Sequence, residues 1–444
     1  MRYLTKSRFK TALECATKLY YTGKKSEYAN EKLDDPFLRE LARGGFQVGE
    51  LAKFLFCDNP VKEQITIETL DYDEALKETQ RRFDANKRTI IAEAAFQYKT
   101  LFVRTDILIK DADRLDMYEV KAKSVGEEDN AFITKRGVAA KWVKYLYDIA
   151  FQKYVAVNAC RDKNISVSAH FILVDKTLRA TVAGLNQKFK IYNSSGGRPK
   201  VEIERGLTKG ALGNQILRIV NVDIEIERIW NEFHVPTGGI RGMKFEEFVN
   251  LCAEAYSKDV RIFTSVGSRC KKCEFVNSGK ETNGLKSGRA ECWKKATNYS
   301  DELLKKDLVI DLWAGGTGSR GLVDELTASG KFLIEAVEEA DVIPKSQSKT
   351  LGLTSHQRRM EQIRRAKIGT KECYFDKDGF AAQMESWVYP LHMIDFETTM
   401  TAVPFHDGRR PYEGIAFQFS HHTIQKDGTV AHAGQYLSFI PGTF

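Results

Sequence analysis

Two carboxylates and a lysine in the first half of the chain have the types and spacing that metal-dependent phosphodiester hydrolysis requires. They are Asp106 in RTDIL, and Glu119 and Lys121 in EVKAK. Carboxylate oxygens bind Mg²⁺ or Mn²⁺ and leave positions for water and phosphate. A lysine beside them orients or helps to deprotonate the attacking water, and it offsets charge on the phosphorane. A Glu-Val-Lys triplet is also common on an ordinary polar sheet face. The surrounding sequence must therefore distinguish a catalytic site from such a face.

Three consecutive strands are predicted to position these side chains. Alternation of apolar and polar residues predicts strands at 90–98, 101–110 and 115–122, with an Asp-rich turn at 111–114. Side chains two apart on a strand share a face, so Glu119 and Lys121 project together. If the strand before pairs antiparallel with theirs, Asp106 reaches the same face. Two carboxylates and an ammonium then share one small volume.

The flanking segments predict an α/β fold with a mixed sheet between helices. Apolar periodicity predicts a helix over 139–159 and a buried strand over 166–174, after the three strands. Before them we expect a helix within 1–22, a helix, Gly-Gly break and second helix over 36–56, and a charged helix over 68–88.

The three residues, together with Gln152 in DIAFQKY, resemble the RecB-type branch of the PD-(D/E)XK nuclease superfamily. The resemblance implies a restriction-endonuclease-like core. It also implies that Asp106 and Glu119 bind the metal, that Lys121 is the catalytic lysine and that Gln152 supports the site. Glu93, on the preceding strand, matches a frequently acidic position and is a further metal-ligand candidate.

The chain departs from that family pattern in two places. Related nucleases often have a histidine after a G-x-x-V pattern, whereas Gly49 follows Val48 here. They also often read Q-x-x-x-Y, whereas Ala156 stands four residues after Gln152 and Tyr154 is nearer. These departures concern metal preference and ancillary contacts, and the core triad is intact.

The cysteines predict a second metal centre. Cys270 and Cys273 form a C-x-x-C pair, which places two thiolates on one turn, and Cys292 follows. The cationic neighbours Arg269, Lys271 and Lys272 are expected to lower the thiol pKa values. Some RecB-type nucleases carry an iron–sulfur cluster held by one cysteine near the N-terminus and three after the core. The resemblance therefore adds Cys15 and favours [4Fe–4S], with a Cys₄ zinc site as the alternative.

Composition limits the classes that remain. The 444 residues provide for two or three domains, and 42% hydrophobic residues are ordinary for a globular chain. The chain has no apolar run of about 18 residues and no apolar signal core, so we expect a cytoplasmic protein without a membrane span. A net charge of +8 permits nucleic-acid binding without requiring it. The glycine-rich stretch 314–321 lacks the P-loop pattern, which disfavours nucleotide binding.

The C-terminal stretch has a different character. A predicted strand ends in Asp395-Phe396-Glu397, which resembles the first motif of DnaQ-like, RNase H-fold exonucleases. The stretch that follows resembles an uncharacterised domain fused to RecB-type nucleases in bacteria. A complete exonuclease site of this class needs further residues much farther along, so we expect a partial module at 389–444. Asp395 and Glu397 are candidates for a second site.

These observations predict a nuclease domain over 1–300, a helical connecting region over 301–388 and the partial DnaQ-like module. The function expected is a Mg²⁺- or Mn²⁺-dependent deoxyribonuclease in DNA repair, recombination or defence against foreign DNA, whose partners are DNA and proteins of such a complex. The alternative is a nucleic-acid-binding or scaffold protein that retains a nuclease fold without catalysis.

Overall fold

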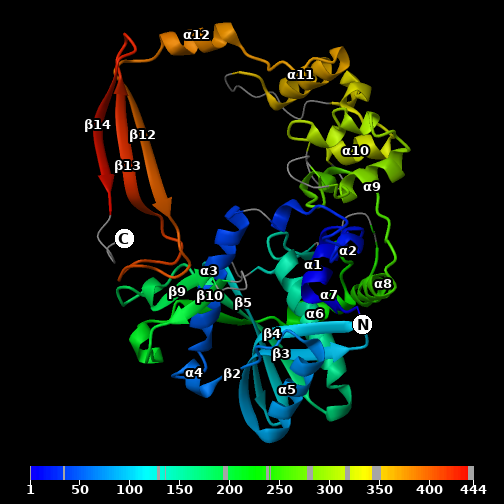
Figure 1. Cartoon of the computed structure of the whole chain (residues 1–444), viewed down its shortest axis with the longest axis vertical. Helices are drawn as coiled ribbons and strands as arrows, with labels where there is room; N and C mark the ends of the chain where they lie inside the picture. Colours follow the sequence, from blue (N-terminus) through cyan, green and yellow to red (C-terminus); the bar gives the residue numbers. More distant parts are fainter. Residues whose placement is uncertain are drawn as a thin grey trace.

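The structure, a computed structural model, describes residues 2–33, 36–127, 131–135, 137–193, 199–236, 240, 242–277, 284–315, 321–342 and 352–438. It has three parts (Figure 1). A helix-flanked sheet forms the largest part, helices α9 to α11 form a second, and the strands β12 to β14 stand apart as a third.

The central sheet is mixed, which confirms the predicted α/β class. Within the described chain it has seven strands, in the order β11-β8-β5-β4-β3-β2 with β1 beside β4. Their bounds are β1 Leu4–Thr5, β2 Ile65–Thr66, β3 Arg88–Tyr98, β4 Leu101–Asp111, β5 Arg114–Val125, β8 Ser166–Asp175 and β11 Leu217–Asn221. The strands β3, β4 and β5 form an antiparallel meander, as predicted. The strand β8 runs parallel to β5, which requires the crossover helix α6 (Val143–Ala159).

Period-2 alternation in the strands gives the sheet two buried faces. Leu108 and Met117 contribute to one core, which packs against α6, and Ile107 and Ile109 contribute to the other. The first face is covered by α1 Lys6–Glu14, α5 Tyr72–Ala85, α6, α7 Asp223–Asn231 and α8 Phe245–Ser257. The second face is covered by α3 Pro36–Lys53 and the hairpin of β9 Phe189–Asn193 and β10 Pro199–Ile203.

Two helix predictions near the N-terminus are wrong in detail. The helix α3 continues through Gly44 and Gly45 without a break. Glycine costs helix stability only modestly, and Val48, Leu51 and Ala52 are buried against the sheet, so packing outweighs propensity. The expected helix within 1–22 is divided into α1 and α2 (Lys18–Tyr21) because Cys15 is extended.

The smaller elements connect these layers. They are α4 Pro60–Glu63, β6 Ile133–Thr134, β7 Gly137–Val138 and the 3₁₀ turns η1 Glu31–Leu33, η2 Arg161–Lys163, η3 Asn186–Lys188 and η4 Lys209–Leu212. Among the described residues, no helix is long and apolar enough to cross a membrane.

The second part is a small helical unit with its own apolar core. Its elements are η5 Ser268–Lys272, α9 Gly288–Thr297, η6 Leu303–Lys305, η7 Val309–Asp311, α10 Leu322–Ala328, η8 Ile334–Ala336, η9 Glu339–Asp341 and α11 Ser355–Ile368. The helix α12 Lys377–Glu385 has no buried residue and lies on the connection to the third part (Figure 1). Val266 and Trp293 share this core with Val309 and Ile334, so apolar packing crosses the predicted boundary near residue 300. The positions of the domain boundaries remain predictions.

The third part is the antiparallel sheet of β12 Leu391–Thr399, β13 Ile415–Ile424 and β14 Val430–Leu437. Most of its side chains are exposed, whereas the connection between β12 and β13 packs on the first part. Ala402 and Val403 are buried there, and Gly184 N–H donates to the Phe405 carbonyl over 2.8 Å. The C-terminal stretch therefore contributes to the core beneath the central sheet.

Candidate functional site

The structure places Asp106 and Glu119 opposite each other on β4 and β5. Ile107 pairs with Tyr118, and the next position along brings the two acids together. Both lie on the sheet face that α6 covers, because their side chains follow the alternation of Leu108 and Met117. Asp106 Oδ2 accepts the Val120 N–H over 2.8 Å, which fixes the carboxylate to the neighbouring strand.

Glu119 is buried, with 1% of its side chain exposed. Lys121 contacts Glu119 Oε1, and Gln152 Nε2 donates to Glu119 Oε2 over 2.9 Å. Burial acts to raise the pKa of Glu119, but the ammonium groups of Lys121 and Lys6 outweigh burial and hold the pKa well below its usual range. Glu119 is therefore an anion.

Lys121 lies between two buried acids. Its Nζ contacts Glu119 and lies 3.3 Å from Asp148 Oδ2. Burial lowers the pKa of Lys121, and the charges of Glu119, Asp148 and Asp106 raise it by more, so that it lies above its usual value. Lys121 is therefore a cation at neutral pH, able to donate hydrogen bonds to water or to an anion.

The helix α6 supplies two polar side chains one turn apart. Gln152 lies on α6, and its amide also donates to Asp148 Oδ1 over 3.3 Å. Asp148 was missed, although an acid inside the apolar run YLYDIAF is a signal that could have indicated it. Its carboxylate is fully buried and also lies 3.1 Å from Lys10 Nζ.

Lys6 is the second residue that the sequence analysis missed. Its Nζ lies 3.2 Å from Asp106 Oδ1 and 3.2 Å from Glu119 Oε2. The strand β1 pairs with β4 and ends one residue earlier, which delivers Lys6 to the acids. Burial lowers the pKa of Lys6, and Asp106 and Glu119 raise it well above its usual value. Nothing in the local sequence of Lys6 indicates this contact 100 residues away.

The donor set fits a hard divalent cation. Asp106 and Glu119 offer carboxylate oxygens, and the ammonium of Lys6 already shows that a cation is stabilised between them. Burial, followed by the charge of Glu119, raises the pKa of Asp106, so a cation favours its ionised form. In the described part of the chain, no three His, Cys, Asp or Glu side chains are arranged to hold an ion together.

Glu93 stands at the same level of the sheet, on β3. The ladder between β3 and β4 skips Glu93 and Asp106, and Glu93 has a φ of 60°, in the left-handed region. Its carboxylate lies 3.3 Å from Arg104 Nε. Burial and the charge of Asp106 raise the pKa of Glu93, which places it within electrostatic reach of the site. Its role as a metal ligand remains a prediction.

The structure brings the four cysteines of the predicted cluster into one neighbourhood. Cys270 and Cys292 contact the apolar core of the helical unit, and Cys273 and Cys292 contact the core around Tyr21. Burial raises the pKa of Cys292 to about 11, with further contributions from the thiols of Cys15 and Cys270. The four free thiols come from three segments and have the donor chemistry of a Cys₄ centre, while no three of the described Cys, His, Asp or Glu side chains are arranged to hold an ion together.

The expectation that basic neighbours lower these thiol pKa values is wrong. Burial raises the pKa of Cys270, and it raises that of Cys273 to about 12. Arg269 acts to lower the pKa of Cys270, but desolvation of the thiolate outweighs this effect. The side chains of Lys271 and Lys272 are exposed, so solvent screens their influence on the thiols.

Asp395 and Glu397 lie on one face of β12, with Ser420 and Gln418 opposite on β13. Both acids are exposed. Two histidine pairs are described on this sheet: His392 and His421 lie on the other face of β12, whereas His422, which is opposite Met393 and contacts His432, lies on the face of Asp395. This candidate second site therefore lacks the burial and the cations that surround Asp106 and Glu119.

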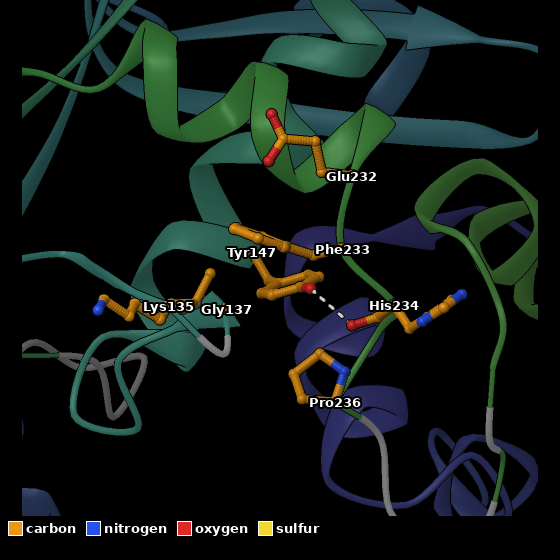
Figure 2. A pocket seen from close by; sticks show the side chains of 8 residues that line it. Lys135, Gly137, Tyr147, Glu232, Phe233, His234 and Pro236 are labelled. Atoms are coloured by element: carbon orange, nitrogen blue, oxygen red, sulfur yellow. Dashed lines mark hydrogen bonds between the residues drawn. The ribbon is translucent and has the colours of Figure 1, made fainter.

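A separate cavity of about 300 Å³ lies beside α6 and the end of α7 (Figure 2). The Tyr147 hydroxyl donates to the His234 carbonyl over 3.3 Å, and Phe233 lies above the Tyr147 ring. Among the described residues that line this cavity, Glu232 is the acidic one. The cavity includes none of Asp106, Glu119, Lys121 or Gln152, so it does not form part of the acid site.

Comparison with known proteins gives one match. Residues 392–442 match a family described as a domain of unknown function (DUF2779). No curated protein and no solved structure matches the chain. The matched stretch includes β12 to β14 and the connection that packs beneath the central sheet.

Proposed function

We propose that the chain is a metal-dependent deoxyribonuclease of PD-(D/E)XK type whose active site is Asp106, Glu119 and Lys121. The observation that carries the proposal is the position of Lys121, a buried ammonium held by Glu119 and Asp148 beside a second carboxylate. The antiparallel meander followed by a crossover to a parallel strand supports the proposed core. Repair, recombination or defence in the cytoplasm, with partner proteins, remains the expected setting.

Each residue has a definite part in this reaction. Asp106 and Glu119 would hold Mg²⁺ or Mn²⁺, which when bound supplies charge stabilisation and a more acidic water. Lys121 donates hydrogen bonds to the attacking water and to a non-bridging phosphate oxygen as negative charge develops. Gln152 fixes the orientation of Glu119 through its 2.9 Å hydrogen bond. Asp148 holds the Lys121 ammonium in place.

The proposed cysteine centre has a structural part. Cys15 directly follows α1, the helix that carries Lys6, while Cys270, Cys273 and Cys292 belong to the helical unit. A [4Fe–4S] cluster, or zinc as the alternative, would join these segments. Hydrolysis requires no electron transfer, so the centre would stabilise the fold.

One observation favours the alternative of a binding or scaffold protein without catalysis. The Lys6 ammonium neutralises the same two carboxylates that a metal ion would neutralise. A protein in which Lys6 permanently replaces the metal would keep the fold and bind DNA without cutting it.

The experiment is cleavage of end-labelled single- and double-stranded DNA by protein purified without oxygen, with Mg²⁺, Mn²⁺ or EDTA. The variants are Asp106→Asn and, as the matched control, Asp395→Asn. We expect wild type and Asp395→Asn to cut with metal only, and Asp106→Asn to be inactive while still folded. Loss of activity in Asp395→Asn alone would move the active site to the C-terminal sheet. DNA binding without cleavage by wild type would favour the scaffold.

A further inference from the structure

A large cleft of about 1220 Å³ opens beside Lys121. Its walls come from α3, the end of β5, the start of β9 with the turn before it, and the segment 398–405 together with Tyr412. The last wall lies within the stretch that matches the domain of unknown function. Lys121 belongs both to this cleft and to the acid site, so the cleft reaches the proposed reaction centre at this residue, whereas Asp106, Glu119 and Gln152 do not line it.

The charge of the cleft has one sign. Arg43, Lys121, Lys123 and Lys190 line it, and none of its described lining residues is acidic. The chain as a whole has 68 basic and 60 acidic residues, so a lining with cations only departs from the average surface. Such a lining favours a polyanion.

Aromatic rings accompany these cations. Tyr145, Phe405 and Tyr412 line the cleft and are partly exposed. Tyr412 has a φ of 60°, an uncommon conformation for a bulky residue, and its backbone N–H donates to the Thr401 carbonyl over 2.8 Å. Its hydroxyl donates to the carbonyl of Ala122, the residue after Lys121. The strained residue thus connects the C-terminal wall to the catalytic strand.

We propose that this cleft holds a single strand of DNA, and that the segment 398–412 is a substrate-guiding wall of the nuclease site. This inference rests on the proposed function. The strand's phosphates face Lys190 and Lys123, and unpaired bases stack on the ring of Phe405, because the Lys123 ammonium already lies over the Tyr145 ring, 5.3 Å from its centroid. Aromatic stacking requires bases that are not paired in a duplex, which selects a single strand.

The test is the binding of a fluorescently labelled single-stranded oligonucleotide in EDTA, measured by anisotropy, so that no cleavage interferes. We expect Phe405→Ala to weaken binding about tenfold or more, and Phe405→Trp to restore it. Lys190→Gln should lower the slope of log affinity against log salt by about 0.7, the effect of one phosphate contact to a single strand. Lys62→Glu, an exposed lysine on α4 outside the cleft, should bind as wild type. Melting curves establish that each variant is folded.

The outcomes separate this inference from the proposed function. Wild-type affinity for the oligonucleotide in both Phe405→Ala and Lys190→Gln would refute the proposal that the cleft binds DNA, even if cleavage still depended on Asp106. Equal or tighter binding of blunt duplex, or of RNA alone, would overturn the assignment to single-stranded DNA. Binding that these variants weaken, in a protein that never cuts, would support the cleft and refute the nuclease.

Discussion

The Lys6 ammonium lies 3.2 Å from Asp106 Oδ1, in the position from which a bound metal ion would neutralise the same carboxylate. Lys6 is the first residue of α1. The Phe9 ring of this helix stacks on Phe151 of α6, with ring centroids 4.5 Å apart, and so attaches α1 to α6. Lys6 therefore supplies one of the positive charges that offset the two carboxylates, and under the proposed function a metal ion would compete with this ammonium.

Replacing Lys6 with methionine tests this relationship. In EDTA we expect the free energy of unfolding to fall by about 2 kcal/mol, because the two acids lose one partner and keep Lys121. Mn²⁺ should bind about tenfold more tightly than to wild type and restore stability, because no ammonium competes. Urea unfolding and titration calorimetry measure both effects. Lys10→Met, which removes one of the partners of Asp148 instead, is the control, and weaker Mn²⁺ binding by Lys6→Met would contradict the interpretation.

Asp148→Asn tests how Lys121, the proposed catalytic lysine, is held in place. We expect single-turnover cleavage to slow by about 10- to 100-fold, because Lys121 loses one of its two carboxylate partners. DNA binding in EDTA should be unchanged. Tyr154→Phe is the matched control on the same helix, since its hydroxyl donates to Glu246 outside the site. A wild-type rate in Asp148→Asn would show that Glu119 alone positions the lysine.

The two acids should have opposite effects on the pH dependence of stability. The pKa of Glu119 is lowered by folding, so its stabilising contribution is present above its unfolded pKa of about 4.3 and is lost as the pH falls. The pKa of Asp106 is raised, so its contribution is present below about pH 3.9 and is lost as the pH rises through the folded value.

Urea unfolding in EDTA between about pH 3.5 and 8 measures these contributions. Relative to wild type, Glu119→Gln should become less stable as the pH rises, by about 3 kcal/mol at neutral pH. Asp106→Asn should gain relative stability over the same range. A loss of relative stability by Asp106→Asn as the pH rises would contradict the assigned shift.

The cysteine centre makes a separate prediction. Protein isolated without oxygen should contain iron, with broad visible absorbance, or colourless zinc. Cys292→Ser should lose the metal and melt at a lower temperature, whereas Cys373→Ser, an exposed cysteine outside the group, should retain it. Because the free thiol pKa of Cys292 is about 11, loading at neutral pH should release protons. Wild type without iron or zinc would refute the centre.

The sequence predicted the parts of the site that depend on local patterns. Alternation and the short turn gave β4 and β5, and a pair of antiparallel strands then places Asp106 beside Glu119. Gln152 followed from the resemblance, and the structure brings it within 2.9 Å of Glu119.

The contacts that the sequence did not predict depend on packing between distant segments. Lys6 reaches the acids only because β1 pairs with β4, and residues 402–403 enter the core only because their loop folds back. The expected break at Gly44 failed for a related reason, since burial of α3 outweighs the weak helix propensity of glycine. Local patterns carry no information about such contacts.

The most direct test of the central claim compares Lys121→Met with Lys110→Met in single-turnover cleavage of end-labelled DNA with Mn²⁺. Lys110 lies on β4 and contacts the Asn86 carbonyl, away from the acids. We predict that Lys121→Met cuts about 100-fold more slowly or not at all while remaining folded and binding DNA, and that Lys110→Met cuts as wild type. Cleavage by Lys121→Met at the wild-type rate would contradict the assignment of the active site.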